Sequence, residues 1–289
     1  MLVEKFTWLN GKIIESYKAS CSILTHSLHY ASSVFEGIIV LDKKPFKLRE
    51  HIARLFLSAK IMGINVTFNE KQIEEACHSL INKNILTKEF YYIRPIIYRD
   101  IENMTIIGDK NSMANIAIII KKHSNLFPQK NSLRLFASSW KKPQPYSMPH
   151  QSKCSGNYML SILSKQEASK KNFDDALLLD YDNKIAEAAS ANIFFIKNKT
   201  LLTPKTKNCL NGITRQEIIR IAIRNNFEVK ETDIKLEDIN NFDESFLTGT
   251  TIGVRNVKSI SFLSNVIDFK SSKLSNLISK LYLSVLKDS

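Results

Sequence analysis

The sequence is poor in several features that would indicate other classes of protein. It has eight glycines, seven prolines and four cysteines among 289 residues, and no run of eighteen apolar residues. A helix needs about 20 apolar residues to cross a bilayer, so no membrane span is expected. The segment Met1–Trp8 also lacks the apolar stretch of a secretory signal peptide.

The cysteines are few and far apart. Cys21, Cys77, Cys154 and Cys209 form no CxxC pair. Closely spaced cysteines are typical of zinc sites and redox dithiols, so neither is predicted, and no metal is expected. Free thiols persist in a reducing compartment, and we therefore expect a cytoplasmic protein.

Acidic residues are outnumbered, which gives a formal net charge of +13. A strong positive charge can indicate a nucleic-acid-binding protein. Here the lysines are scattered along the chain beside Asn and Ile rather than gathered in a stripe. This pattern is typical of solvated faces, so neither a nucleic acid nor a membrane is predicted as a partner. A positive field would still attract small anionic ligands.

Local patterns predict strands and helices in separate groups. Apolar residues recur at spacings of three and four over Leu48–Met62 and Lys71–Asn84, with Asn69 as a cap for the second helix. Further helices are expected at Asn157–Lys171, Arg215–Asn225 and Leu274–Leu286, and strands at Lys5–Trp8, Lys12–Ile14, Val34–Leu41, Lys44–Lys47, Phe90–Tyr98, Asn115–Lys121, Leu133–Trp140, Ala176–Leu179, Ile185–Glu187, Asn192–Ile196 and Leu201–Leu202. Strands grouped beside separate helices favour an α+β fold over alternating βαβ units.

The chain is long enough for two domains of ordinary size. A polar stretch around Pro128 is the best candidate for a connection between them. We predict an N-terminal α/β domain over 1–122, an interdomain linker over 123–132 and a C-terminal domain over 133–289.

Four of the eight glycines lie in short motifs. Gly37 ends the block His26–Gly37, Gly156 lies in Ser152–Tyr158, Gly212 in Leu210–Arg215 and Gly249 in Leu247–Thr251, and a further block covers Ile185–Phe194. In this order, the blocks resemble the class IV (fold type IV) aminotransferases that use pyridoxal 5'-phosphate (PLP). The resemblance is closest to the branched-chain amino-acid aminotransferases and runs from about Trp8 to the C-terminus.

The resemblance implies a fold and a reaction. The fold is the α+β fold type IV, with two α/β-type domains and PLP between them, the C-terminal domain being the PLP-binding one. The reaction is ping-pong transamination of L-Leu, L-Ile or L-Val with 2-oxoglutarate through a lysine Schiff base. The family also implies amino-acid and keto-acid substrates, a role in branched-chain amino acid biosynthesis, and a homodimer or higher homo-oligomer.

The resemblance also assigns the cofactor-binding residues. Lys153 is the Schiff-base and catalytic residue, whose amine later shuttles a proton. Glu187 would keep the ring nitrogen protonated, and Tyr158 would hydrogen-bond to the phenolate oxygen. The remaining cofactor-binding residues are Arg54, Leu210, Ile213, Thr214 and Thr250.

Five of these assignments have a purely structural alternative. Lys153 and Arg54 would be solvated surface charges, and Tyr158 a half-buried aromatic at a helix start. Glu187 would be a strand residue that faces water. Thr214 would only cap a helix, in a capping box with Glu217.

Substrate contacts are implied for six residues: Tyr30, Phe35, Tyr92, Arg94, Trp140 and Thr251. Tyr92 and Arg94 are two residues apart on a predicted strand, so their side chains lie on the same face. Tyr30 would come from the partner subunit. As isolated aromatics, Tyr30, Phe35 and Trp140 would be assigned to the core.

The sequence departs from the family at the expected substrate pocket. Ile39 stands where an arginine is usual, and the loop after Thr250 carries Thr251, Ile252, Gly253 and Asn256 instead of two small residues, Glu and, three positions later, Pro. Added methyl-sized groups in a pocket change the discrimination between similar substrates by about 1–3 kcal/mol. We therefore expect an altered preference among Leu, Ile and Val and reduced 2-oxoglutarate affinity.

Three alternatives share some of these features. A D-amino-acid aminotransferase and an aminodeoxychorismate lyase have the same fold and lysine, but the His26–Gly37 block argues against both. Thr250 and Thr251 give weak support to the D-specific branch. A non-catalytic basic binding protein on a degenerate fold is disfavoured because Lys153, Glu187 and Thr214 are all present.

Overall fold

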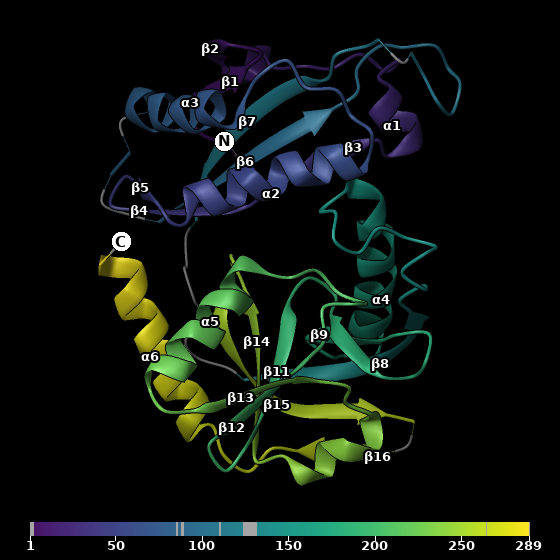
Figure 1. The fold of residues 1–289 in the computed structure, drawn as a ribbon, viewed down its shortest axis with the longest axis vertical. Helices are drawn as coiled ribbons and strands as arrows, with labels where there is room; N and C mark the ends of the chain where they lie inside the picture. Colours follow the sequence, from purple (N-terminus) through teal and green to yellow (C-terminus); the bar gives the residue numbers. More distant parts are fainter. Residues whose placement is uncertain are drawn as a thin grey trace. The chain divides into compact units, whose positions relative to one another are not determined.

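The computed structural model describes residues 3–84, 86–87, 90–109, 111–123, 132–263 and 265–288. The chain divides into two compact units (Figure 1), of which one comprises the described residues of Met1–Asn125 with Ser152–Asn157. The other comprises those of Leu126–Gln151 and Tyr158–Asp288. The predicted linker at 123–132 lies almost wholly outside the described residues. The sequence assigns everything after 133 to one domain, whereas Ser152–Asn157 groups by its contacts with the first unit.

The first unit is built on an antiparallel sheet with the strand order β2-β1-β7-β6-β4-β5, and β3 also pairs with β6. The strands are β1 (Phe6–Leu9), β2 (Lys12–Glu15), β3 (Ser33–Phe35), β4 (Ile38–Leu41), β5 (Lys44–Pro45), β6 (Tyr91–Tyr98) and β7 (Asn115–Lys122). β7 alternates between buried and half-buried residues, as expected for a strand with one face on a core.

Two helices, α2 (Leu48–Ile61) and α3 (Glu70–Lys83), pack against this sheet (Figure 1). Their apolar residues join those of the sheet in a single core that contains Ile52, Leu80 and Ile118. The predicted cap of the second helix is confirmed, because Asn69 and Gln72 form a reciprocal capping box. A short helix that the sequence did not predict, α1 (His26–Tyr30), precedes β3.

The predicted strand Val34–Leu41 is interrupted between β3 and β4. Both halves pair with β6 in the same register, which places Glu36 opposite Pro95. The Glu36 amide donates to the Pro95 carbonyl at 2.9 Å, but proline has no N–H to donate back. The ladder is therefore broken at Glu36.

The second unit contains a mixed sheet with the order β10-β9-β8-β15-β14-β11-β12-β13, and β16 pairs with β15. The strands are β8 (Leu133–Lys141), β9 (Asp175–Leu179), β10 (Ile185–Ala188), β11 (Asn192–Lys197), β12 (Thr200–Pro204), β13 (Glu228–Thr232), β14 (Glu244–Gly249), β15 (Gly253–Phe262) and β16 (Asn265–Asp268). β8 pairs in parallel with β9 and β15, and β12 with β13. Buried residues such as Ile193, Phe195 and Leu247 form its core.

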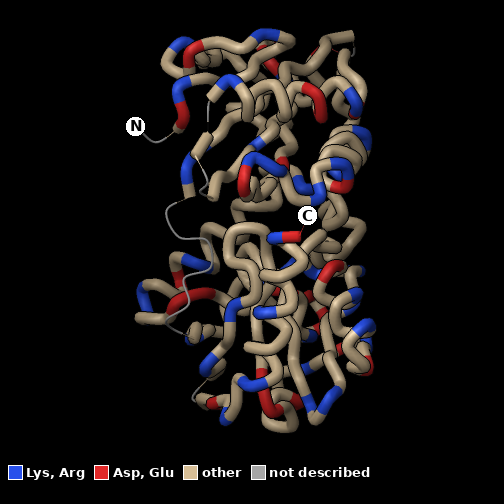
Figure 2. Tube along the Cα trace, turned by 90° about the vertical axis from the view of Figure 1, so that its left-hand side faces the viewer, with Lys and Arg blue, Asp and Glu red and all other residues tan. Residues whose placement is uncertain are grey.

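Three helices cover this sheet (Figure 1). α4 (Tyr158–Lys170) packs on β8 and β9, whereas α5 (Ile213–Arg224) and α6 (Lys273–Asp288) pack on each other and on β14. None of the helices in the described residues has the length and apolar character needed to span a membrane. Basic and acidic residues are interspersed along the trace of both units (Figure 2).

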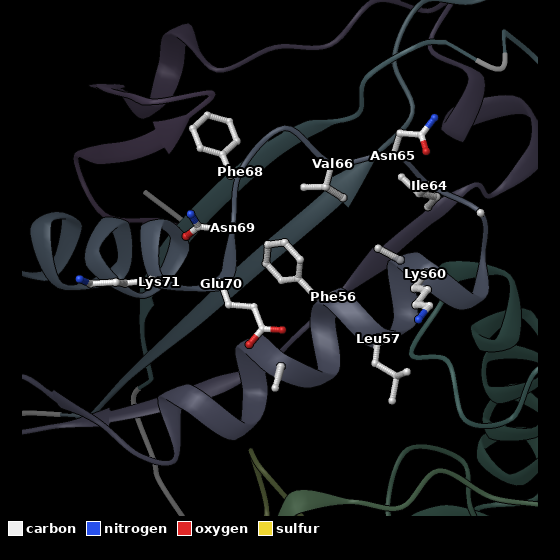
Figure 3. Close-up of a pocket in the computed structure, with 13 residues that line it drawn as sticks. Phe56, Leu57, Lys60, Ile64, Asn65, Val66, Phe68, Asn69, Glu70 and Lys71 are labelled. Atoms are coloured by element: carbon white, nitrogen blue, oxygen red, sulfur yellow. The ribbon is translucent and has the colours of Figure 1, made fainter.

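The first unit also has an open groove of about 990 Å³ (Figure 3). It is lined by residues of α2, of the segment 63–69 and of the start of α3, including Phe56, Leu57, Val66 and Phe68. No residue that the sequence assigns to a cofactor or substrate lines it.

Candidate active site

The peptide of Lys153 is fixed within the first unit. Its amide donates to Ser58 Oγ on α2 at 3.0 Å, and its carbonyl accepts from the Phe35 amide at 3.1 Å. The next residue, Cys154, forms an isolated bridge with Val34 in β3. Because both neighbouring elements hold the backbone, the fold sets where the Lys153 side chain begins.

An aromatic ring lies close to two cations beside this peptide. The centroid of the Phe35 ring is 5.2 Å from Lys153 Nζ and 4.9 Å from the guanidinium carbon of Arg94. Nε and Nη2 of Arg94 donate to the hydroxyl of Tyr92 at 3.2 and 2.9 Å. The structure therefore brings Lys153, Phe35, Tyr92 and Arg94 together, and this cationic and aromatic surface suits an anionic substrate.

Gly37 is required by the position of Tyr92. A Cβ atom at residue 37 would lie 2.4 Å from the Tyr92 hydroxyl oxygen. No real Cβ contact is that short, so a side chain here would displace the tyrosine. The glycine of the Phe35–Gly37 motif thus keeps the ring of Tyr92 over the backbone.

Arg54 belongs to a buried cluster of charged and polar groups. Its Nε and Nη2 donate to the two carboxylate oxygens of Glu36 at 2.5 and 2.9 Å, and His51 Nδ1 lies 2.7 Å from Glu36 Oε2. The Gly37 amide donates to the same oxygen at 3.1 Å. The Arg54 side chain is 13% exposed, so the alternative of a solvated helix charge is wrong.

The cluster fixes the charge of its members. Burial by itself would raise the pKa of Glu36, but the charge of Arg54 and the hydrogen bonds from Arg54 and His51 outweigh it and hold the pKa far below its ordinary value. Burial lowers the pKa of His51, and the positive charges of Arg54 and Lys153 lower it further. Together they outweigh the charge and the hydrogen bond of Glu36, which raise it. A neutral His51 that donates from Nδ1 to an ionised Glu36 fits both shifts.

Glu187 lies in the second unit on β10, where the register with β9 shifts between Ile185 and Glu187. Such a bulge re-aims a side chain. Its Oε1 lies 2.5 Å from Nζ of Lys142, just after β8, and no hydrogen bond to Oε2 occurs within the described part of the chain. The Glu187 side chain is only 13% exposed, so the alternative of a carboxylate that faces water is wrong.

The first turn of α5 provides backbone donors. Gly212 is its N-cap and makes no side-chain cap, and the first helical hydrogen bond is Gln216 N–H to Gly212 O. The amides of Ile213 and Thr214 precede that bond and have no acceptor among the residues that the structure describes. The positive end of a helix with unpaired amides is suited to a phosphate.

The geometry at Gly212 is set by Asn192. Asn192 Nδ2 donates to the Leu210 carbonyl at 2.9 Å, and a Cβ at residue 212 would lie 2.2 Å from Asn192 Oδ1. The capping-box interpretation of Thr214 is wrong because α5 already begins at Ile213. The Thr214 hydroxyl instead hydrogen-bonds to Tyr282 on α6, and burial raises the pKa of that tyrosine to about 12.

A second group of donors lies in the turn between β14 and β15. Gly249 pairs with Gly253 across the turn, which contains Thr250 and Thr251. In the described chain, neither threonine amide has an acceptor. Ile252 packs against the core of the unit, whereas Thr251 is exposed.

The three remaining predicted residues lie on α1, β8 and α4. Tyr30 on α1 is 42% exposed, and its hydroxyl donates to the Met104 carbonyl at 3.2 Å. Trp140 on β8 is also exposed. Tyr158 begins α4 and interacts electrostatically with Lys142. No contact joins Tyr30 to another predicted site residue within the described part of the first unit.

These residues fit PLP by the chemistry of their donors. A fixed lysine and a buried arginine lie in the first unit, and a buried carboxylate and two groups of backbone amides lie in the second. They match the aldehyde, the phosphate and the ring nitrogen of that cofactor.

Three residues of these clusters are absent from the sequence-based assignment: Glu36, His51 and Lys142. His51 and Arg54 are three apart on a predicted helix and therefore share a face, which was a usable signal. Glu36 lies in the motif that ends at Gly37. Nothing in the sequence distinguishes Lys142 from its neighbour Lys141.

Comparison with known proteins identifies the family. The family model described as amino-transferase class IV matches residues 33–260. A Rickettsia bellii protein named probable branched-chain-amino-acid aminotransferase is 40% identical over 277 residues, which cover 96% of this chain and 94% of the relative. The Escherichia coli K12 protein named branched-chain-amino-acid aminotransferase is 34% identical over 263 residues, which cover 88% and 84%.

Solved structures give the same result. The crystal structure of the T.th. branched-chain amino acid aminotransferase with pyridoxamine 5'-phosphate superposes with a TM-score of 0.92 at 30% identity and covers 98% of this chain and 94% of that one. The Escherichia coli enzyme gives 0.91 at 31% identity, with coverage of 97% and 94%. The predicted α+β fold of type IV is thus confirmed, and the chain belongs to the class IV aminotransferases.

Proposed function

We propose that the protein is a PLP-dependent aminotransferase that acts on L-Leu, L-Ile and L-Val with 2-oxoglutarate as the acceptor, by a ping-pong mechanism. The observation that carries the proposal is the peptide of Lys153, which is held by Ser58 on α2 and by Phe35 in β3. It lies beside aromatic and cationic side chains, as a lysine that must meet an anionic substrate requires. The names of the relatives support branched-chain amino acids as substrates.

Each cofactor-binding residue has a distinct task in this proposal. When bound, PLP supplies an electron sink for the carbon that loses its proton. Lys153 would bind the cofactor's aldehyde carbon through its amine and would also carry the proton in the reaction. Glu187 keeps the ring nitrogen protonated, and Tyr158 donates to the phenolate oxygen.

The phosphate would be held from several elements. The amides of Ile213 and Thr214 and the turn at Thr250 donate to it, and the Leu210 carbonyl fixes Asn192 beside the helix start. Arg54 adds a positive charge, and its two hydrogen bonds to Glu36 fix the orientation of its guanidinium group. Thr214 would serve the phosphate through its backbone amide and its hydroxyl, because a hydroxyl that accepts from Tyr282 can still donate.

Substrate selection falls to the six residues Tyr30, Phe35, Tyr92, Arg94, Trp140 and Thr251. Arg94 and Tyr92 would receive a carboxylate, and the aromatic rings would receive the branched side chain. Since Ile39 is buried and apolar where an arginine is usual, binding of 2-oxoglutarate should be weakened. Replacing Thr251 and Ile252 together by alanine should move the preference among Leu, Ile and Val by roughly 10-fold, within the range for methyl-sized changes.

Chemical trapping of the Schiff base tests the lysine. Borohydride reduction of the purified enzyme and peptide mapping should place the pyridoxyl group on Lys153. Lys153→Ala should lose turnover and retain PLP through the phosphate contacts, whereas the matched control Lys71→Ala, whose side chain is 84% exposed, should behave as wild type. A label on another lysine contradicts the assignment. A substrate panel that favours D-alanine, or pyruvate released from aminodeoxychorismate, contradicts the branched-chain assignment alone.

A homodimer is the second part of the proposal. Exposed apolar side chains gather on α1 and on the segment 101–113, including Leu28, Ile106 and Ile107. A cavity of about 410 Å³ lies nearby on the sheet and is lined by Leu28, Ile96 and Ile119. Apolar surface of this extent is typical of a protein interface, and it would place Tyr30 at the partner. An active monomer in analytical ultracentrifugation at assay concentration contradicts this part.

The location of the enzyme is the third part. All four cysteines are free thiols in the structure. Thiols stay reduced in the cytoplasm, where we place the protein. Fractionation of cells that express a tagged copy tests this placement.

A further inference from the structure

Glu187, the carboxylate assigned to the cofactor's ring nitrogen, forms an ion pair with Lys142. Lys142 Nζ and Glu187 Oε1 are 2.5 Å apart, and their side chains are 11% and 13% exposed. Lys142 follows β8 and Glu187 lies on β10, so the two strands that flank β9 present the pair. An ion pair this buried is strongly coupled, unlike one on the surface.

The pair has one open side. Lys142 uses Oε1, and within the described chain Oε2 of Glu187 accepts no hydrogen bond. A carboxylate oxygen has lone pairs for further donors. Oε2 is thus the oxygen that remains for a ring N–H.

Other titratable groups surround the pair from neighbouring elements. Burial of Lys142 opposes its charge, but the charge of Glu187 and its hydrogen bond outweigh burial and raise the pKa of Lys142. Cys209 and Tyr158 also interact with Lys142, and burial together with the charge of Lys142 lowers the pKa of His150 despite its bond to the Pro143 carbonyl. Lys142 is therefore the one cation that contacts Glu187 in the described part of the second unit.

We propose that Lys142 is a positioning residue for the reaction: it holds Oε1 of Glu187, presents Oε2 to the cofactor's ring nitrogen and limits how tightly the proton shared between Oε2 and that nitrogen is held. The inference rests on the proposed function, because it needs Glu187 at the ring nitrogen. It concerns a residue that acts through Glu187 and needs no contact with substrate.

The sign of the effect follows from electrostatics. An ammonium beside the carboxylate competes with the ring cation for the same negative charge. Without it, the carboxylate and the ring nitrogen together hold their proton more strongly. Removing the charge of Lys142 should therefore raise the proton affinity of the ring roughly 10-fold, which moves its midpoint up by about one pH unit.

The test is a titration of the holoenzyme reconstituted with PLP that carries ¹⁵N in the ring. The ring ¹⁵N shift is followed against pH in wild type and in Lys142→Met. The midpoint should rise by about one unit in Lys142→Met and stay at the wild-type value in Lys142→Arg, which keeps the charge. Lys141→Met is the matched control, since the neighbouring lysine is exposed and bonds to Asn183 instead. If Lys142→Met does not fold, Lys142→Gln replaces it.

A second measurement separates the pair from the cofactor. Unfolding of the PLP-free protein in wild type, Lys142→Met, Glu187→Gln and the double variant gives the coupling between the two side chains, and the double variant should be less destabilised than the sum. An unchanged ring midpoint in Lys142→Met, with a changed one in Glu187→Gln, overturns the inference and leaves the proposed function standing. An unchanged midpoint in Glu187→Gln as well contradicts the role of Glu187 itself.

Discussion

Two buried carboxylates, one in each unit, are treated by the fold in opposite ways. Glu36 accepts from four donors: two nitrogens of Arg54, Nδ1 of His51 and the Gly37 amide. Among the described residues, Glu187 is contacted by one donor, Lys142. Both lie out of water, but only one of them has its hydrogen-bonding capacity filled.

The difference indicates what each carboxylate is for. A fully bonded acid has no capacity left for a ligand, so the role of Glu36 is to fix other groups, above all the planar guanidinium of Arg54. An acid with one open oxygen is a binding group, and the fold leaves Glu187 in that state. The predictions below probe this contrast.

The largest effect on stability is expected for Glu36→Gln. The substitution leaves Arg54 buried without its counter-charge, and breaking such a pair costs about 3–5 kcal/mol. Denaturant unfolding of the PLP-free protein measures the loss. Glu50→Gln on the same helix as Arg54 is the control, because that side chain is 46% exposed and should change stability little. If Glu36→Gln lowers the free energy of unfolding by less than about 1 kcal/mol, as for a surface pair, Glu36 is not the counter-charge that stabilises the buried Arg54.

Glu187→Gln should show the reverse balance. We expect a rate loss of roughly 10²-fold or more, about 2.7 kcal/mol, with the fold intact. Stability should fall by less than in Glu36→Gln, because one contact rather than four is lost. Steady-state kinetics and unfolding of the same preparation measure both quantities. Near-normal turnover would show that another group protonates the ring.

Gly37→Ala tests how tightly the backbone at residue 37 packs against the ring of Tyr92. The added methyl group would meet the Tyr92 hydroxyl at 2.4 Å, and overpacking of this kind costs about 1–3 kcal/mol. Thermal unfolding measures the cost. Adding Tyr92→Phe removes the clashing oxygen and should recover part of the stability. Two ring carbons at 2.8 and 2.9 Å remain in that double variant, so the decisive comparison is the cost of Gly37→Ala in a Tyr92→Ala background, which lacks the ring. An equal cost there would show that the contact does not explain the glycine.

The smallest effect concerns pH. The pKa values of Glu36 and His51 are both lower in the folded state, so the unfolded chain binds more protons at acid pH. His51 should remove stability as the pH falls below about 6.5, and Glu36 as it falls below about 4.3 towards its lower folded value, by up to about 1.4 kcal/mol per group for each pH unit. His51→Gln should flatten the first of these slopes and leave the second. Unfolding free energies between about pH 2.5 and 8 cover both slopes, and an unchanged slope near pH 6 contradicts the role of His51.

The fold was largely predictable where the hydrophobic period was strong. The helices α2 and α3 and the Asn69 cap follow from the sequence, because their apolar residues face one core. The strands β13 to β16 do not. β13 carries charged residues on both sides and is mostly exposed, so its pairing with β12 shows no alternation in sequence. The break at Glu36 depends on Pro95, about sixty residues away, which no local pattern reveals.

The site was predictable as a set of motifs and not as a set of interactions. Glycines with a motif around them marked the candidate segments, and the structure gives a steric reason for two of these glycines: Gly37 beside Tyr92 and Gly212 beside Asn192. The partner of Glu187 was not predictable, because Lys141 and Lys142 are adjacent and chemically identical. Only the strand positions decide which of them turns inward and which bonds to Asn183.

The return of Ser152–Asn157 to the first unit has a consequence for biosynthesis. The ribosome first synthesises the main body of that unit, then residues 126–151 of the other unit, and only then the segment Ser152–Asn157 that completes the first unit. Synthesis of the intervening residues takes a few seconds at about 5–20 residues per second. Until then, Val34 in β3 and Ser58 on α2 lack the backbone that they bind in the finished protein. A nascent chain that stops before Ser152 should therefore recruit chaperones through these unfilled edges. Lys153 belongs to the last part of the first unit to be synthesised.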